Sequence, residues 1–197
     1  MSSKIDDREI RPPKFERLGC RIVWGDGGEP ADAYADSALK AFGLGADVVA
    51  ALAPRGPLAA GFRDVHRTIA RLADAAGTPL FVVGGYSSLR PAPDADRFVT
   101  DLGHIPAELH DEIRARAALV IDDLPATPAT LDRVFLSPAL RCGARMPGER
   151  LGRSRLGDDV AVQPEDGGAI SAADYALGFV DPIEKGDHHR TQVNFGH

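Results

Sequence analysis

The chain has 197 residues, of which 44% are hydrophobic and 26% charged, and its formal net charge is −6. This composition is typical of a globular chain with a sizeable core, which excludes overall disorder, and the length suits one domain. The acidic balance excludes a strongly basic surface, so we expect neither nucleic acid nor an anionic membrane as a partner.

Residues 1–17 are polar and contain two adjacent prolines, so we expect a polar arm ahead of a single domain over residues 18–197. The two cysteines, Cys20 and Cys142, are far apart in the sequence and are interpreted as free thiols in a reducing compartment. No apolar run approaches the length of a membrane span, and no secretory signal is visible. We therefore expect a cytoplasmic protein.

Short apolar runs and helical periodicities alternate along the chain. The apolar runs predict strands covered on both faces, and the periodic segments between them predict helices. Ser171, with Asp174 three residues later, predicts the start of a last helix, which we expect Pro182 to interrupt. Alternation of this kind indicates an α/β fold with a parallel sheet. The predicted strands are residues 20–25, 47–53, 79–83 and 133–136, and the predicted helices before the last are 30–42, 59–76 and 107–124.

The turn after the first predicted strand, "GDGGEP", stands where a phosphate-binding glycine loop would lie. A dinucleotide site needs G-x-G-x-x-G between a strand and a helix, so that backbone amides can approach the pyrophosphate. Here Asp26 and Glu29 would repel a phosphate, and Pro30 lacks an amide donor. We therefore expect NADH and NADPH to bind weakly or not at all.

Six motifs occur in a fixed order over most of the chain. With them the chain resembles the atypical short-chain dehydrogenase/reductases, an NAD(P)H-binding, epimerase-like family that includes biliverdin/flavin reductase B-like proteins. The resemblance implies a Rossmann-like parallel sheet flanked by helices and a small-molecule oxidoreductase using NADP or NAD without a metal. The family's first glycine-loop unit has no counterpart here, so we expect an N-terminally shortened sheet. The motifs are "RIVWGDG", "GADVVAALAP", "GTPLFVVGGYSSL", "RVFLSPA", "SRLGDD" and "ISAADYA".

The resemblance also implies site residues. Ser88 would lie beside the nicotinamide and substrate, and Tyr86 would supply a phenol or narrow the pocket. Independently of the resemblance, His104 lies near the start of a predicted helix, and its imidazole could transfer a proton near neutral pH. A polar turn for Ser88 and Tyr86, and a surface position for His104, remain open alternatives. The chain contains no Tyr-x-x-x-Lys pair. The implied cofactor-binding residues are Asp26, Ala53, Pro54, Gly84, Gly85, Ser137, Pro138 and Ala139.

Two other functions stay open. A fold without a phosphate loop could run a cofactor-independent isomerase, cyclase or lyase reaction in the pocket after Gly84, with Tyr86, Ser88 and His104 as proton carriers. Alternatively, the chain could be a non-catalytic binding or regulatory subunit of a complete relative. In the enzymatic cases the partner is a small-molecule substrate, and we expect any ligand to contact Gly85, Tyr86, Ser88 and Pro138.

Without the family's first two strands, the edge of the strand over residues 47–53 needs a new partner. We expect the strand over residues 20–25 to pair with it directly, because the connection is long enough for a right-handed crossover. Residues 1–17 would then cover the old cofactor crevice. The rival arrangement is a homodimer, or a pair with a complete relative, joined through that edge.

Overall fold

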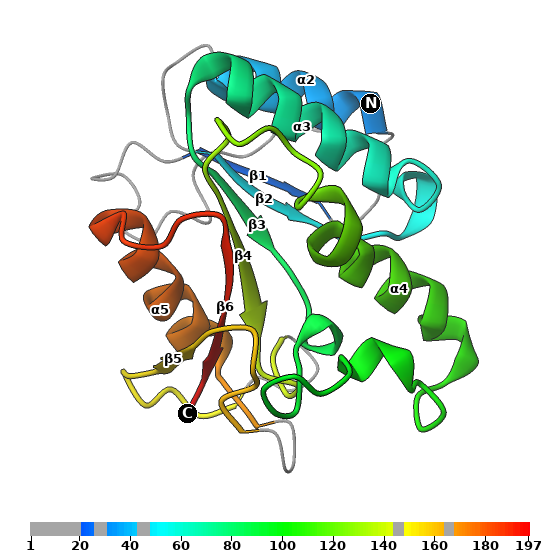
Figure 1. Ribbon diagram of the computed structural model, residues 1–197, viewed down its shortest axis with the longest axis vertical. Coiled ribbons are helices and arrows are strands. Elements are labelled where there is room, and N and C mark those ends of the chain that lie inside the picture. The colour runs from blue at the N-terminus through cyan, green and yellow to red at the C-terminus, as the bar shows by residue number, and fades with distance from the viewer. Residues whose placement is uncertain (1–20, 26–30, 43–47, 144–147, 164–167) are drawn as a thin grey trace.

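The computed structural model describes residues 21–25, 31–42, 48–143, 148–163 and 168–197, in which six strands form one sheet (Figure 1). The strand order is β1-β2-β3-β4-β6-β5, and every neighbouring pair is parallel except β5 with β6. The predicted α/β class with a Rossmann-like parallel sheet is confirmed. The strands are β1 (Arg21–Gly25), β2 (Val48–Leu52), β3 (Leu80–Val83), β4 (Arg133–Pro138), β5 (Arg155–Gly157) and β6 (Thr191–Gly196).

Four α-helices connect the strands. Helix α3 ends at Gly77, whose φ of 62° lies in the left-handed region that glycine adopts without strain. Helix α5 begins as predicted, because Ser171 Oγ accepts a hydrogen bond from the backbone N–H of Asp174 over 3.0 Å. The helices are α2 (Ala31–Phe42), α3 (Phe62–Ala76), α4 (His110–Ala118) and α5 (Ala172–Lys185).

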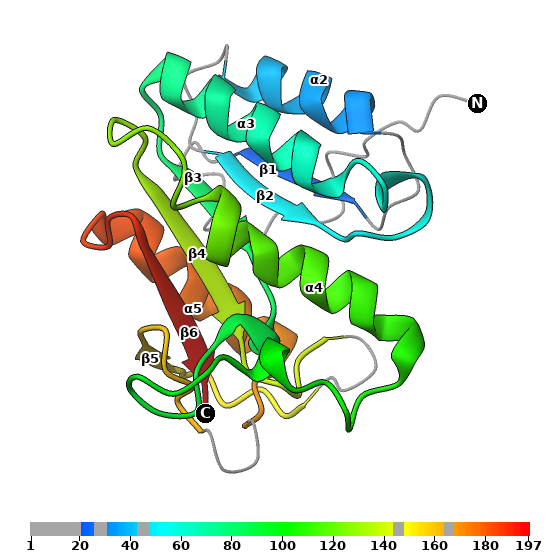
Figure 2. The ribbon, with the colours of Figure 1, turned by 45° about the vertical axis from the view of Figure 1, so that its right-hand side comes forward.

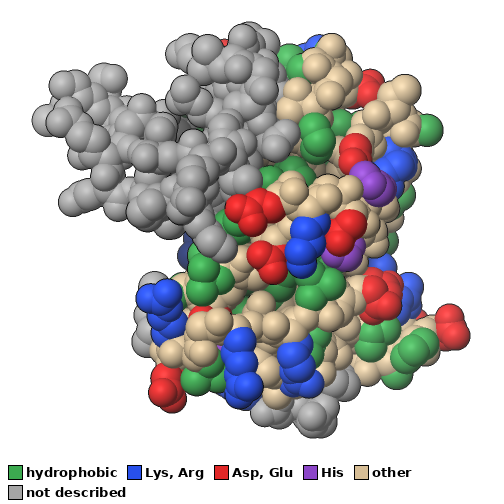
Figure 3. All heavy atoms as spheres, turned by 90° about the vertical axis from the view of Figure 1, so that its left-hand side faces the viewer, with side chains coloured by type: hydrophobic (Ala, Val, Ile, Leu, Met, Phe, Trp, Pro, Cys, Tyr) green, Lys and Arg blue, Asp and Glu red, His purple; other side chains and the backbone are tan. Residues whose placement is uncertain are grey.

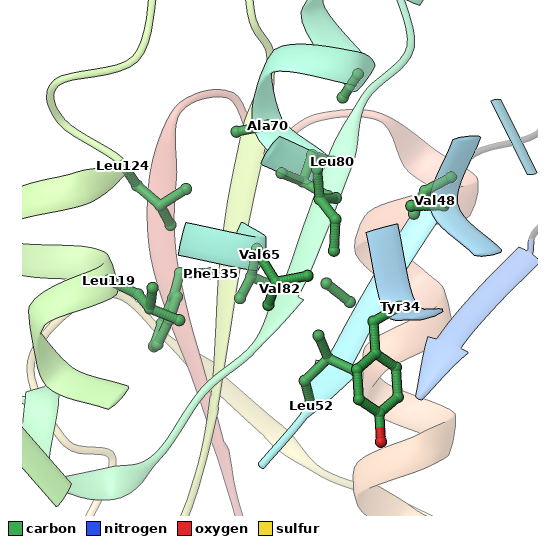
Figure 4. Packing of buried hydrophobic residues seen from close by; sticks show 14 of the residues in the cluster. Tyr34, Val48, Leu52, Val65, Ala70, Leu80, Val82, Leu119, Leu124 and Phe135 are labelled. Atoms are coloured by element: carbon green, nitrogen blue, oxygen red, sulfur yellow. The ribbon is translucent and has the colours of Figure 1, made fainter. Parts of the chain in front are cut away.

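The helices cover both faces of the sheet, with α2, α3 and the α4 region on one face and α5 on the other (Figure 2). Strand side chains alternate between the faces, so β2, β3 and β4 each contribute to two cores. Leu80 and Val82 of β3 belong to the core under α3, whereas Phe81 belongs to the core under α5. Figure 4 shows part of the first core, including Leu80, Val82 and Phe135.

The last crossover differs in hand from the first three. Helices α2, α3 and α4 lie on one face while the chain steps along the sheet from β1 to β4. Helix α5 makes the next step in the same direction, from β4 to β6, but covers the opposite face. Its crossover therefore has the opposite hand to the usual right-handed one. As a result, β4 lies between the α4 layer and α5.

The expected direct pairing of the first two strands is confirmed. Strand β1 pairs in parallel with β2 over its whole length, and β2 pairs with β3 on its other side. The rival, in which β2 offers a free edge to a second chain, is wrong because both of its edges are occupied. The predicted arm over residues 1–17 lies outside the described residues.

The predicted helix over residues 107–124 is divided. A short 3-10 turn over Ala107–Leu109 leads into α4, and the π-helical segment η5 (Leu119–Asp123) follows. The backbone N–H of Leu124 donates to Leu119 O, five residues back, over 2.7 Å. This wider turn shifts the phase of the helix, and Ile121 within it is exposed.

Two further expectations about the C-terminal part were wrong. Pro182 does not interrupt α5, because it lies buried in the last part of a helix that continues to Lys185. Strand β6, in a segment with no predicted strand, was missed because Gln192 and Asn194 break its apolar pattern. Both side chains are buried, and polar groups on neighbouring segments satisfy them.

Candidate functional site

The carboxyl ends of β2, β3 and β4 lie at one edge of the sheet, because these strands are neighbours and parallel. The residues at and directly after these ends include the ones that the sequence indicated. Of these, Pro54, Ala139 and Ser137 are buried, whereas Ala53 and Pro138 are half-buried. Asp26, the remaining cofactor residue implied by the resemblance, lies outside the described residues.

The two glycines after β3 have different surroundings. A Cβ added to Gly84 would lie 1.9 Å from the ring carbon Cε1 of Phe135, so the absence of a side chain there serves the packing of the core. A Cβ added to Gly85 would lie 3.2 Å from Cδ of Arg116, a flexible side chain on α4. Gly84 therefore has a structural role, whereas Gly85 is the glycine whose backbone faces a charged side chain.

Ser88 and Ser137 come together in a closed polar network. Ser88 is 2% exposed, and its hydroxyl donates to Gly85 O over 3.0 Å. The amide nitrogen of Gln192 donates to Ser88 Oγ over 2.9 Å and to Ser137 Oγ over 3.0 Å. Arg97 donates to the amide oxygen of Gln192 and to Ser88 O. The proton of the Ser88 hydroxyl is thus used within the protein.

The other two predicted catalytic residues have different surroundings. Tyr86 shares the 3-10 turn Tyr86–Ser88 with Ser88, and its ring stacks on Phe98 with centroids 4.6 Å apart. His104 is exposed on the loop between β3 and α4. The catalytic roles of Ser88, Tyr86 and His104 remain predictions.

A cluster of two arginines and one glutamate also lies at this edge, and the sequence did not indicate it. Glu112 accepts two hydrogen bonds from Arg55, over 2.7 and 2.8 Å, and one from Arg116 over 3.1 Å. Two positive charges therefore share one carboxylate. The buried Nε of Arg116 has no hydrogen-bond partner among the described residues, although the whole side chain is 26% exposed.

Burial has different effects on the two guanidinium groups. Burial lowers the pKa of Arg116, the nearby Glu112 carboxylate opposes that shift, and the Arg55 charge reinforces it. The hydrogen bond to Glu112 raises the pKa of Arg55, which is mostly exposed. Arg116 is therefore the group that would gain most from an anion placed beside it.

Tyr175 and Cys142 lie on the α5 side of the sheet, where both pack against the core under α5. The Tyr175 hydroxyl donates to Leu136 O over 2.9 Å, and its ring meets Phe195 edge-on. Burial, assisted by the nearby Cys142, raises the pKa of Tyr175 well above its ordinary value. Tyr175 therefore packs against the core and is not placed to act as a general acid.

The C-terminal histidines have separate partners. His188 Nε2 is 3.4 Å from an oxygen of Asp187, whereas His189 Nδ1 is 2.8 Å from an oxygen of Asp132. No group of three or more His, Cys, Asp or Glu side chains that could hold a metal ion is present in the described ranges. On the face that Figure 3 shows, acidic, basic and histidine side chains are interspersed among the described residues.

No helix in the described part of the chain combines the length and the apolar character needed to cross a bilayer. No protein-family model matches the sequence, and no curated protein matches it.

Solved structures do match the chain. A "putative epimerase" from Bacteroides thetaiotaomicron is 31% identical, with a TM-score of 0.68, and the match covers 83% of this chain and 72% of that one. A "putative exported protein" from Burkholderia pseudomallei is also 31% identical, with a TM-score of 0.65 and coverage of 83% and 77%.

A "putative NADH-flavin reductase" from Streptococcus pneumoniae is 22% identical, covers 89% of this chain and 98% of its own, and has a TM-score of 0.59. At this identity the match shows the fold alone. The Bacteroides structure, with its higher sequence identity and its coverage, shows the family as well as the fold. The chain belongs to the broad epimerase-like family with a Rossmann-like fold.

Proposed function

We propose that this protein is a small-molecule oxidoreductase-like member of its family that binds an anionic ligand of the nicotinamide-nucleotide class at the carboxyl edge of β2–β4. The observation that carries the proposal is the cluster of Arg55, Glu112 and Arg116, which has one more positive than negative charge. A ligand phosphate would accept a hydrogen bond from Arg116 Nε, which has no acceptor among the described residues. Gly85, beside Arg116, would let the ligand approach the backbone.

The residues fit one anionic group better than two. A dinucleotide also needs a site for its pyrophosphate, and the sequence has no G-x-G-x-x-G. We therefore expect a mononucleotide to gain most of the available binding free energy and a dinucleotide to gain little more. When bound, a nicotinamide would supply hydride transfer, and the protein would position it and exclude water.

The expectation is tested by calorimetric titration with nicotinamide mononucleotide and NADPH. We expect dissociation constants on the order of 0.1–1 mM for both, equal within about threefold. Arg116→Gln should weaken mononucleotide binding at least tenfold, because it removes a charge-assisted hydrogen bond. The matched control is Arg114→Gln on the same helix, whose exposed side chain lies 3.8 Å from Asp111.

Three outcomes would count against the proposal. If mononucleotide binding never saturates, the protein has no specific site for it. If Arg116→Gln binds the mononucleotide as tightly as the wild type, Arg116 does not hold the phosphate. Low-micromolar binding of NADPH would show that the chain holds a pyrophosphate site after all. A protein that binds the reduced mononucleotide but never oxidises it, with FMN offered as the acceptor, would favour the non-catalytic alternative.

A further inference from the structure

A groove lies between α3 and η5, away from the carboxyl edge of the sheet, and its volume is about 260 Å³. Its apolar lining comes from Ala70 on α3, Val82 on β3, and Leu119 and Leu124 in and directly after η5. Figure 4 shows these four side chains in the core under α3. An apolar cavity of about 150 Å³ accepts benzene, so this groove has room for a molecule of two fused rings.

His66 on α3 lines the same groove and is 3% exposed. Its Nδ1 lies 2.8 Å from Phe62 O, and because a carbonyl oxygen only accepts, Nδ1 carries the proton of the neutral ring. Nε2 is then a bare acceptor, and it has no donor within the described residues. A buried acceptor without a donor is unfavourable, and a ligand that donates a hydrogen bond would remove this cost.

The neutral form of His66 dominates at ordinary pH. Burial lowers its pKa to about 4, the hydrogen bond with Phe62 and the charge of Asp123 oppose that shift, and the charge of Arg116 adds to it. The ring therefore presents an acceptor and not a second donor, so a carboxylate or phosphate has nothing to bind at Nε2.

The π-helical segment forms one wall of the groove. It places Leu119 in the groove and Asp123 at the rim, where Arg63 and Arg67 hold the carboxylate at 2.7 and 2.9 Å. Single π turns occur often at functional sites, where the extra residue redirects side chains. Here it turns Leu124 inward and Ile121 outward, so the wall is apolar on the inside.

We propose that this groove binds an apolar two-ring molecule that carries one hydroxyl or N–H donor, with the donor hydrogen-bonded to His66 Nε2. Because Nε2 is closed to solvent, the donor reaches it after side chains at the inner end of the groove move aside. The site is independent of the nucleotide site at the carboxyl edge, and neither needs the other to be occupied.

Two probes that differ in a single donor test the proposal: 2-naphthol and 2-methoxynaphthalene. Calorimetry at pH 7.5 should show saturable 2-naphthol binding at submillimolar concentration. The ether, which cannot donate, should bind at least fivefold more weakly to the same protein. Amide shifts in a nuclear magnetic resonance titration should be largest around Leu119 and Leu124.

Three variants locate the site. Ala126→Trp places a large ring at the exposed mouth of the groove and should weaken 2-naphthol binding at least tenfold. Its control is Ala75→Trp, at an exposed position of α3 outside the groove lining, which should leave the affinity unchanged. His66→Phe keeps a ring beside Phe62 but removes the acceptor, so the two probes should then bind equally.

The proposal is overturned if 2-naphthol binding does not saturate at concentrations up to about 5 mM. It is also overturned if the ether binds wild-type protein as tightly as the alcohol, or if Ala126→Trp binds 2-naphthol normally. If His66→Phe does not fold, the two probes on the wild type and on Ala126→Trp still decide the matter.

Discussion

Buried polar groups are satisfied differently in two regions of the molecule. One region is the end of the sheet around β4 and β6, and the other is the helical layer of α3 and α4. At the first, Ser88, Ser137 and Gln192 satisfy one another and Arg97 closes the network. In the second, His66 Nε2 and Arg116 Nε are buried without a partner among the described residues. The first region stabilises the fold, and the second holds the groups that a ligand would satisfy.

The difference shows that a polar residue at the carboxyl end of a parallel strand is not by itself a binding group. Ser88 and Ser137 occupy positions where such sheets bind ligands, yet their hydroxyls are committed to internal hydrogen bonds. Free hydrogen-bonding capacity lies instead on helices that pack over the sheet. A buried polar group without a partner destabilises the fold by about 1–3 kcal/mol, and such groups persist at sites where they serve binding.

The largest expected effect on stability comes from a substitution at Gly84. Gly84→Ala should lower the free energy of unfolding by about 3 kcal/mol or more, because the new methyl group overlaps the buried Phe135 ring. Phe135→Leu added to this variant should recover part of the loss. Urea unfolding measures the stability of both variants. If the free energy of unfolding of Gly84→Ala lies within about 1 kcal/mol of the wild-type value, the packing role is contradicted.

The pH dependence of the free energy of unfolding should reveal the burial of the neutral His66 ring. The pKa of this buried ring is about 4, below its ordinary value of about 6.5, so between these values the unfolded chain binds a proton that the folded chain excludes. Stability should therefore fall as pH falls from about 6.5 to 4, by about 3 kcal/mol from this group. His66→Phe should lack this part of the loss. Parallel pH profiles of the two proteins would contradict the account.

Gln192→Met tests the closed network. The substitution keeps the side chain's length but removes one hydrogen-bond partner from each of two hydroxyls and a guanidinium, so we expect the free energy of unfolding to fall by about 2 kcal/mol. Arg114→Gln, on an exposed helix face, serves as the control and should change it by less than about 0.5 kcal/mol. If the two variants unfold alike, the network contributes little and the contrast between the regions fails.

Gly85→Ala should have the smallest effect on stability and still affect binding. The backbone of Gly85 is extended, with φ −132° and ψ 164°, which any residue can adopt. The methyl group would meet only the flexible Arg116 stem, so we expect a stability change below about 1 kcal/mol and weaker mononucleotide binding by about threefold. Unchanged mononucleotide affinity would separate Gly85 from the site.

The sequence predicted four of the six strands and placed the helices, because apolar runs and helical periodicity report burial directly. Strand β6 escaped because burial of Gln192 and Asn194 depends on partners far away in the chain. Arg116 escaped for a related reason. With Glu112 four residues before it, Arg116 looks like half of an ordinary surface ion pair on a helix. Only the contact of Glu112 with Arg55, 57 residues away, and of Arg116 with Gly85 marks it as part of a site.

A crystal structure of the protein with nicotinamide mononucleotide would test the central claim most directly. The account predicts that the phosphate accepts a hydrogen bond from Arg116 Nε, at about 2.7–2.9 Å, and that the ligand contacts the backbone of Gly85. A mononucleotide bound elsewhere while the carboxyl edge stays empty would contradict it. So would a structure in which Arg116 Nε donates to an acceptor of the protein itself.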